Sequence, residues 1–150
     1  ETQILTQPLL YLSYYFKKNR MEYYDRLMDV RQKGDWENWI KFFLKGIAEV
    51  AVESTDSAKR ILALREKYNE ILSGYNNSNY INLLEQLFMT PSVTKNKVKD
   101  ILDISYPTAS TIVDEFCRLG ILHDDSVEKS RNKKYTFAEY LAILNEGTEL

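Results

Sequence analysis

The chain has 150 residues, of which 44% are hydrophobic and 28% are charged, and its formal net charge at pH 7 is −2. This length accommodates one ordinary domain or two small ones, and the apolar content is sufficient for a core. The single cysteine, Cys117, excludes a disulfide framework, no apolar run reaches transmembrane length, and the slightly negative charge argues against coating of nucleic acid. We therefore expect a cytoplasmic protein that does not contact membranes.

Helical periodicity dominates the first half of the sequence. Apolar spacing predicts helices at residues 7–19, 20–33, 36–53 and 56–72. Gly34 is placed to adopt a left-handed conformation at the end of the second helix, and Asp35 is placed to cap the third. Ser54 or Thr55 is predicted to cap the fourth.

The third and fourth predicted helices differ in their apolar pattern. Residues 36–53 are apolar around most of the helix circumference, which predicts a central helix packed on several sides. The fourth helix is predicted to turn one face inward. The residues of that face are Ala58, Ile61, Leu62, Tyr68, Ile71 and Leu72.

A polar segment divides the chain. "SGYNNSNY" gathers Ser, Gly and Asn between two periodic regions, and it predicts a linker at 74–79 between modules at 1–73 and 80–150. The second module is expected to contain helices at 80–88, 95–103 and 106–119, strands at 121–125 and 133–137, and a final helix at 138–145. Thr94 and Ser105 are predicted helix caps, and Pro107 lies in a first helical turn.

This order of elements predicts a mainly α protein. The first module is expected to be a helical bundle, and the second a winged helix-turn-helix with a two-stranded wing. The stretch "ISYPTASTIVDEFCRLGIL" supplies the second helix of that motif and the entry to the wing.

The sequence offers little for catalysis. One histidine, His123, and one cysteine cannot form a zinc site, and the five glycines are isolated, so no phosphate-binding loop is predicted. His123 is expected to lie on a strand surface and Cys117 beside a buried helix stripe. The adjacent Tyr23 and Tyr24 are more simply explained by core packing than by contact with a nucleobase.

Residues 3 to about 73 nevertheless resemble a known family. The pattern "NRxEYYDxL…GDWExW", within "QPLLYLSYYFKKNRMEYYDRLMDVRQKGDWENWIKFFLKGIAEVA", is similar to the C-terminal part of Fic domains. Fic proteins of this kind often carry a C-terminal winged helix, and "SYPTA" followed by "LGIL" resembles theirs. The resemblance implies a protein adenylyltransferase that moves AMP from ATP to a hydroxyl of a target protein, with Mg²⁺ bound at the catalytic loop.

The family's signature, His-Pro-Phe-x-x-Gly-Asn-Gly-Arg, does not occur in this sequence. We therefore expect that Glu1 falls just after the catalytic loop, that the chain is a fragment without its own cofactor, and that it cannot transfer AMP. The resemblance implies that Tyr23, Tyr24 and Gln32 form part of the nucleotide-pocket wall. Oligomerisation is left open.

Nucleic-acid binding is the alternative function. Candidate contacts on the second helix of the motif are Tyr106, Thr108, Ser110, Thr111 and Arg118, and those on the wing are Lys129, Arg131, Lys133 and Lys134. Asp114 and Glu115 oppose this because DNA affinity depends on neutralised phosphates. A module that binds a target or partner protein is favoured over a transcriptional regulator, such as one that autoregulates a toxin-like locus.

Overall fold

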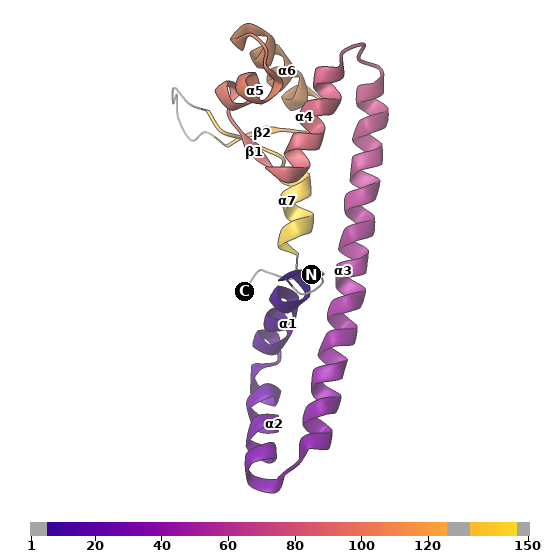
Figure 1. Cartoon of the computed structure of the whole chain (residues 1–150), viewed down its shortest axis with the longest axis vertical. Helices are drawn as coiled ribbons and strands as arrows, with labels where there is room; N and C mark the ends of the chain where they lie inside the picture. Colours follow the sequence, from indigo (N-terminus) through magenta and orange to yellow (C-terminus); the bar gives the residue numbers. More distant parts are fainter. Residues whose placement is uncertain (1–5, 126–132, 147–150) are drawn as a thin grey trace. The chain divides into compact units, whose positions relative to one another are not determined.

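The computed structural model describes residues 6–125 and 133–146, with side chains from residue 12 onward. The described residues form seven helices and a small antiparallel sheet (Figure 1). The helices are α1 (Thr6–Lys18), α2 (Arg20–Lys33), α3 (Trp36–Ser73), α4 (Ser78–Met89), α5 (Lys95–Leu102), α6 (Tyr106–Arg118) and α7 (Ala138–Asn145). The mainly helical prediction is confirmed. Among the described helices, none has an apolar stretch long enough to cross a bilayer.

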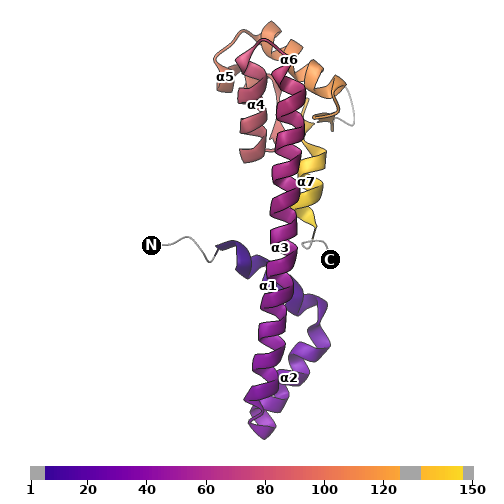
Figure 2. The same ribbon diagram turned by 90° about the vertical axis from the view of Figure 1, so that its right-hand side faces the viewer.

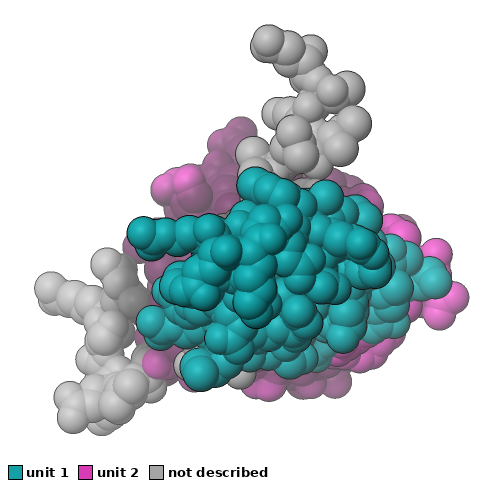
Figure 3. Space-filling view, turned by 90° about the horizontal axis from the view of Figure 1, so that it is seen from below, with its two compact units in different colours: residues 1–59, 145–150 teal, residues 60–144 magenta. Residues whose placement is uncertain are grey.

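The chain divides into two compact units (Figure 3). Unit 1 comprises Glu1–Lys59 and Asn145–Leu150, and unit 2 comprises Arg60–Leu144. The polar segment at 74–79 lies within unit 2, and the division of the chain into modules at that segment stays a prediction.

Helix α3 is one helix rather than two (Figure 2). The predicted break between 53 and 56 is wrong, and Thr55 does not act as a cap. Its Oγ1 donates a hydrogen bond to the Ala51 carbonyl at 2.7 Å instead. Ser and Thr side chains within a helix can bond back to residue i−4 in this way, and no Gly or Pro lies at the predicted break between residues 53 and 56.

The predicted junction between α2 and α3 is confirmed. Gly34 adopts φ 68°, and its N–H donates to the Val30 carbonyl at 3.0 Å. Asp35 caps α3, because its Oδ1 accepts the Asn38 N–H at 3.2 Å. The two helices therefore meet in a short, well-defined turn.

Unit 1 has a small aromatic core. Tyr15 of α1 and Phe42 of α3 are buried with ring centroids 5.4 Å apart, and Val50 extends this cluster along α3. Gly46 lies against Tyr15, because a Cβ at this position would approach the tyrosine ring to 2.6 Å. The absence of a side chain at Gly46 lets α1 approach α3 closely.

Residues 36–53 are not packed on several sides, contrary to prediction. Trp36 is 61% exposed, and Ile40, Leu44 and Ile47 on the same side of α3 are exposed as well. Helices α1 and α2 contact a neighbouring side of α3, through the aromatic cluster. Helix α3 therefore leaves these large apolar side chains exposed among the described residues.

Unit 2 has a larger core. The predicted buried stripe of α6 is confirmed for Ala109, Ile112, Val113 and Phe116, and Leu119 is partly buried. The predicted caps are also confirmed: Thr94 Oγ1 accepts the Lys97 N–H at 3.2 Å, and Ser105 Oγ accepts the Thr108 N–H at 3.4 Å.

The predicted inward face of α3 is confirmed only in part within unit 2, where Tyr68 and Leu72 are buried as predicted and Ile61 is partly buried against the core. Leu64, Tyr68 and Leu72 are buried, whereas Leu62 and Ile71 are exposed. A spacing of four residues selects one stripe of the helix, and Leu62 and Ile71 lie outside it.

The sheet has the strand order β1–β3–β2, with β1 at Ser92–Val93, β2 at His123–Asp124 and β3 at Tyr135–Thr136. Both pairs are antiparallel, and Thr136 lies opposite Ser92 on one side and His123 on the other. The two predicted strands are confirmed in shorter form. Strand β1 was not predicted, because two residues between helices are too few to show strand periodicity.

Candidate functional site

Tyr23 belongs to the aromatic cluster of unit 1. Its ring centroid lies 5.1 Å from that of Phe16 and 5.6 Å from that of Trp39, and the side chain is partly buried. This position agrees with core packing. It also fixes the orientation of α2 against α1 and α3.

Tyr24 points differently. It is 50% exposed, its ring centroid lies 5.4 Å from that of Tyr23 in an edge-on arrangement, and the Arg20 guanidinium lies 5.5 Å from its ring centre. Gln32 is also exposed, about two helical turns further along α2. The structure therefore brings Tyr23 and Tyr24 together and keeps Gln32 on the same helix, with Tyr24 and Gln32 open to solvent.

Two exposed apolar stripes lie close to these residues in unit 1. The α2 stripe consists of Met21, Tyr24, Leu27 and Met28, and the α3 stripe of Trp36, Ile40, Leu44 and Ile47. Residues three or four apart are neighbours on a helix surface, so each stripe is continuous. Single exposed apolar residues are ordinary, but contiguous ones mark surfaces that bind another element or molecule. The sequence showed their helical spacing but not which side of each helix would stay uncovered.

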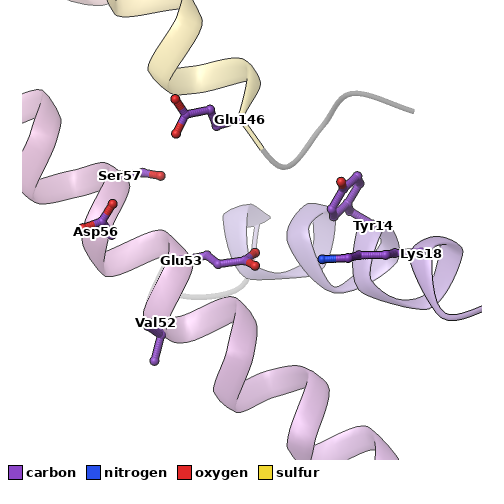
Figure 4. Close-up of a pocket in the computed structure, with 7 residues that line it drawn as sticks. All are labelled: Tyr14, Lys18, Val52, Glu53, Asp56, Ser57 and Glu146. Atoms are coloured by element: carbon purple, nitrogen blue, oxygen red, sulfur yellow. The ribbon is translucent and has the colours of Figure 1, made fainter.

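A separate pocket lies between α1 and α3 in unit 1, with a volume of about 430 Å³ (Figure 4). Its lining is mostly polar and acidic: Tyr14, Lys18, Val52, Glu53, Asp56, Ser57 and Glu146. Figure 4 shows Lys18 and Glu53 extending toward one another. The pocket contains none of the predicted nucleotide-contact residues. Within residues 6–125 and 133–146, no group of His, Cys, Asp and Glu is arranged to hold a metal ion.

The second candidate surface is the exposed side of α6 in unit 2. Tyr106, Thr108 and Thr111 are exposed there, as expected for contact residues. Thr111 Oγ1 donates to the Pro107 carbonyl at 3.1 Å, and Ser105 and Thr108 share a hydrogen bond at 2.8 Å. The hydroxyl groups are therefore partly engaged within the helix itself.

The cations of this surface are engaged with acids. Lys95 Nζ lies 2.6 Å from Asp114 Oδ1 and 2.8 Å from Ser110 Oγ, and Lys133 Nζ lies 2.6 Å from Asp124 Oδ2. Burial is the largest single influence on Lys95 and lowers its pKa, but the hydrogen bond to Asp114, the charge of Asp114 and the contact with Tyr135 together outweigh burial and raise the lysine pKa. The hydrogen bond to Asp124 raises the pKa of Lys133.

Arg118 belongs to a three-residue cluster. Its Nε donates to Glu115 Oε2 at 2.8 Å, and Tyr75 donates its hydroxyl hydrogen to the same carboxylate. The hydrogen bond from Arg118, followed by that from Tyr75, lowers the pKa of Glu115 to about 2. The cluster ties the segment after α3 to the C-terminal end of α6.

The remaining predicted contacts are Lys134, which is exposed, and Lys129 and Arg131, which lie outside the described residues. His123 is exposed on β2, as predicted. Cys117 is partly buried, and burial is the main cause that raises its thiol pKa. A raised pKa disfavours the thiolate, which is the form of cysteine that acts as a nucleophile.

A comparison of the chain with models of known protein families finds no match.

Proposed function

We propose that this chain is the C-terminal part of a Fic-type protein adenylyltransferase, a cytoplasmic enzyme that moves AMP from ATP to a hydroxyl group of a target protein. In this proposal Tyr23, Tyr24 and Gln32 form one wall of the nucleotide pocket. Helices α5 and α6 with strands β1–β3 act as a winged helix that binds the target or a partner protein.

The observation that carries the proposal is the unequal placement of the tandem tyrosines. Tyr23 packs between Phe16 and Trp39, while Tyr24 keeps half of its surface open. A ring held by a rigid helix and open on one side is suited to stacking against a nucleobase. Gln32 adds an amide that can donate and accept hydrogen bonds further along the same helix.

The exposed stripes give independent support. The α2 and α3 stripes leave large apolar side chains uncovered in unit 1, and such surfaces are normally buried against another element. In the proposed enzyme, further helices of the same protein cover them and carry the residues that bind phosphate and Mg²⁺ and accept the hydroxyl proton. The described residues contribute base contacts alone, so the chain itself is inactive in transfer.

The nucleotide wall is tested by binding. The complete gene product, including whatever is encoded upstream of Glu1, is titrated with ATP, and the variants Y24A and Y106A are compared with it. Tyr106 is an exposed tyrosine on α6 in the other unit, so Y106A is a matched control. We expect Y24A to weaken ATP binding by roughly five- to a hundred-fold, since base–aromatic stacking is worth about 1–3 kcal/mol. Equal ATP affinities for Y24A and Y106A would contradict the proposal that Tyr24 forms part of the nucleotide-pocket wall.

The catalytic half of the proposal is tested on the gene and on the same protein. A His-Pro-Phe-x-x-Gly-Asn-Gly-Arg run encoded upstream, together with transfer of label from ATP labelled on the α-phosphate to protein, is the expected result. An upstream sequence without that run would exclude the Fic assignment.

A further inference from the structure

The exposed side of α6, with the start of α5 and the base of the wing, is defined here as the α6 face. Three of its cations, Lys95, Arg118 and Lys133, each lie within 3.0 Å of a carboxylate oxygen. The three carboxylates belong to Asp114, Glu115 and Asp124. The cations and acids balance, so these six residues carry no net charge.

The pairs of Lys95 and Lys133 join residues that are distant in the sequence. Lys95 at the start of α5 reaches Asp114 in the middle of α6, and its Nζ lies 5.7 Å from the centre of the Tyr135 ring on β3. Lys133 reaches Asp124 across the wing. Both lysines are thereby drawn toward protein oxygens at the positions where a winged helix would meet phosphates.

The third pair adds an acid in the last turn of α6. Arg118 is held by Glu115 and also donates to the Tyr75 hydroxyl at 3.3 Å. The Glu115 pKa of about 2 means that this carboxylate stays ionised at every physiological pH. Asp114 and Glu115 are adjacent in sequence, so a nucleic acid that approaches this part of α6 meets two negative charges.

Net charge decides affinity for nucleic acid. Each phosphate neutralised by a protein cation releases counterions, and a cation that already has a carboxylate neighbour brings repulsion along with attraction. Exposed ion pairs are themselves weak, so the obstacle is the acid that remains beside the phosphate rather than the strength of the pair. Among the described residues of α5, α6 and the wing, Lys97 and Lys134 are the cations without an ion pair.

We infer that Asp114, Glu115 and Asp124 are specificity-determining residues that exclude nucleic acid from the α6 face. Discrimination by unfavourable contacts with the wrong ligand is a general way to achieve specificity. The face then fits a protein. Only this last step, that the protein is the target or partner, rests on the proposed function. The exclusion of nucleic acid does not depend on adenylyl transfer.

The test removes the acids and keeps the cations. The full chain and its variant D114N/E115Q/D124N are titrated against a labelled 20-base-pair duplex by fluorescence anisotropy at several salt concentrations. The variant is expected to bind the duplex. The slope of log K against log salt should be near −2.7, because each of the three protein cations that has lost its carboxylate neighbour contributes about −0.9. Its affinity should then fall roughly forty-fold between 50 and 200 mM salt. The original chain is expected to show no saturable binding in this range.

A charge-matched control separates local from global effects. E53Q/E66Q/E70Q removes three exposed acids of α3, changes net charge by the same amount, and should not bind the duplex. Circular dichroism verifies folding, and D114N alone, with a slope near −0.9, serves if the triple variant does not fold. Salt-dependent binding by the original chain, no gain in a folded variant, or an equal gain in the control would each overturn the inference. None of these outcomes bears on ATP binding, so the two proposals fail separately.

Discussion

The two units of this chain differ in how completely they bury their own apolar residues. In unit 2, residues from α3, α4, α5, α6, α7 and the sheet meet in one core, and Phe116, Phe137 and Leu72 are fully enclosed. Among the unit 1 residues whose side chains the structure describes, the buried cluster consists of Tyr15, Phe42 and Val50, and α2 has no buried residue. The described residues thus form a large core in unit 2 and a small one in unit 1.

The difference shows that amphipathic pattern and packing are separate properties. Helix α3 has apolar residues all around its first half, yet the helices that accompany it in unit 1 contact one side. An apolar stripe indicates that a helix surface favours burial. It does not indicate that other elements of the same chain bury that surface. The completeness of each core is therefore the property that mutations should separate most clearly.

The largest contrast is expected between two aromatic truncations. F116A should destabilise the protein by about 3–5 kcal/mol, because Phe116 is fully buried and its loss leaves a cavity. W36A should change stability by less than about 0.5 kcal/mol, because the side chain is mostly exposed. Urea denaturation followed by circular dichroism measures both. A cost for W36A close to that of F116A would show that the α3 stripe is covered in solution.

A second contrast concerns close packing within unit 1. G46A places a methyl group against the Tyr15 ring and near Leu12, where the available space is too small. Overpacking costs about 1–3 kcal/mol, and the better helix propensity of alanine returns up to about 1 kcal/mol. We expect a net loss of about 1–2 kcal/mol, measured by thermal melting with near-UV detection of the aromatic cluster. The variant Y15L, which removes the ring, should reduce this penalty when combined with G46A. An unchanged or higher melting temperature for G46A would mean that α1 does not approach α3 so closely.

Two threonines, one in each unit, test whether a predicted helix cap stabilises the protein. T94A should cost about 1 kcal/mol, because Thr94 caps α5 in unit 2. T55A should change stability by a few tenths of a kcal/mol or less, because Thr55 lies within α3 and alanine favours a helix interior. The substitution is identical, so the difference in denaturation midpoint compares a capping threonine with one inside a helix. Equal losses would support a break in α3 at Thr55.

These threonines also show what the sequence could and could not predict. Thr94 and Ser105 precede short helices, and their role follows from local backbone geometry. Thr55 has the same local chemistry, but nothing after it stops the helix, and continuation of α3 depends on the whole segment. Leu62 was predicted inside because it is apolar, whereas the buried stripe is defined by its neighbours Leu64 and Tyr68. The Glu115–Arg118 pair has an i,i+3 helical spacing that the sequence shows, whereas no sequence spacing indicates that Lys95 meets Asp114 or that Lys133 meets Asp124.

The smallest expected effect concerns the ion pairs, which also differ between the units. The pairs of α2 and the first half of α3, such as Lys41–Glu37, join residues one turn apart on one helix. Pairs in unit 2, such as Arg65–Glu85, Lys67–Glu139 and Lys95–Asp114, connect separate elements. Tyr75 and Glu115 form a similar link between the segment after α3 and α6. Unit 2 thus contains ion pairs that connect separate elements, in addition to Lys99–Asp100 and Arg118–Glu115, which each lie within one helix.

Glu115 provides the sharpest test of that link. Its folded-state pKa, about 2, lies below the usual 4.5, so its contribution to stability is present above pH 4.5 and is lost as pH falls toward 2. Since Arg118 is the main cause, R118M should raise the pKa most, and Y75F should raise it less. Carboxyl-detected NMR titration measures both, with Glu139 as an internal comparison whose pKa is lowered mainly by its hydrogen bond from Tyr68. A Glu115 that titrates near 4.5 in the unmodified chain would show that the link to Tyr75 and Arg118 does not form in solution. The contrast between the units would then rest on their cores alone.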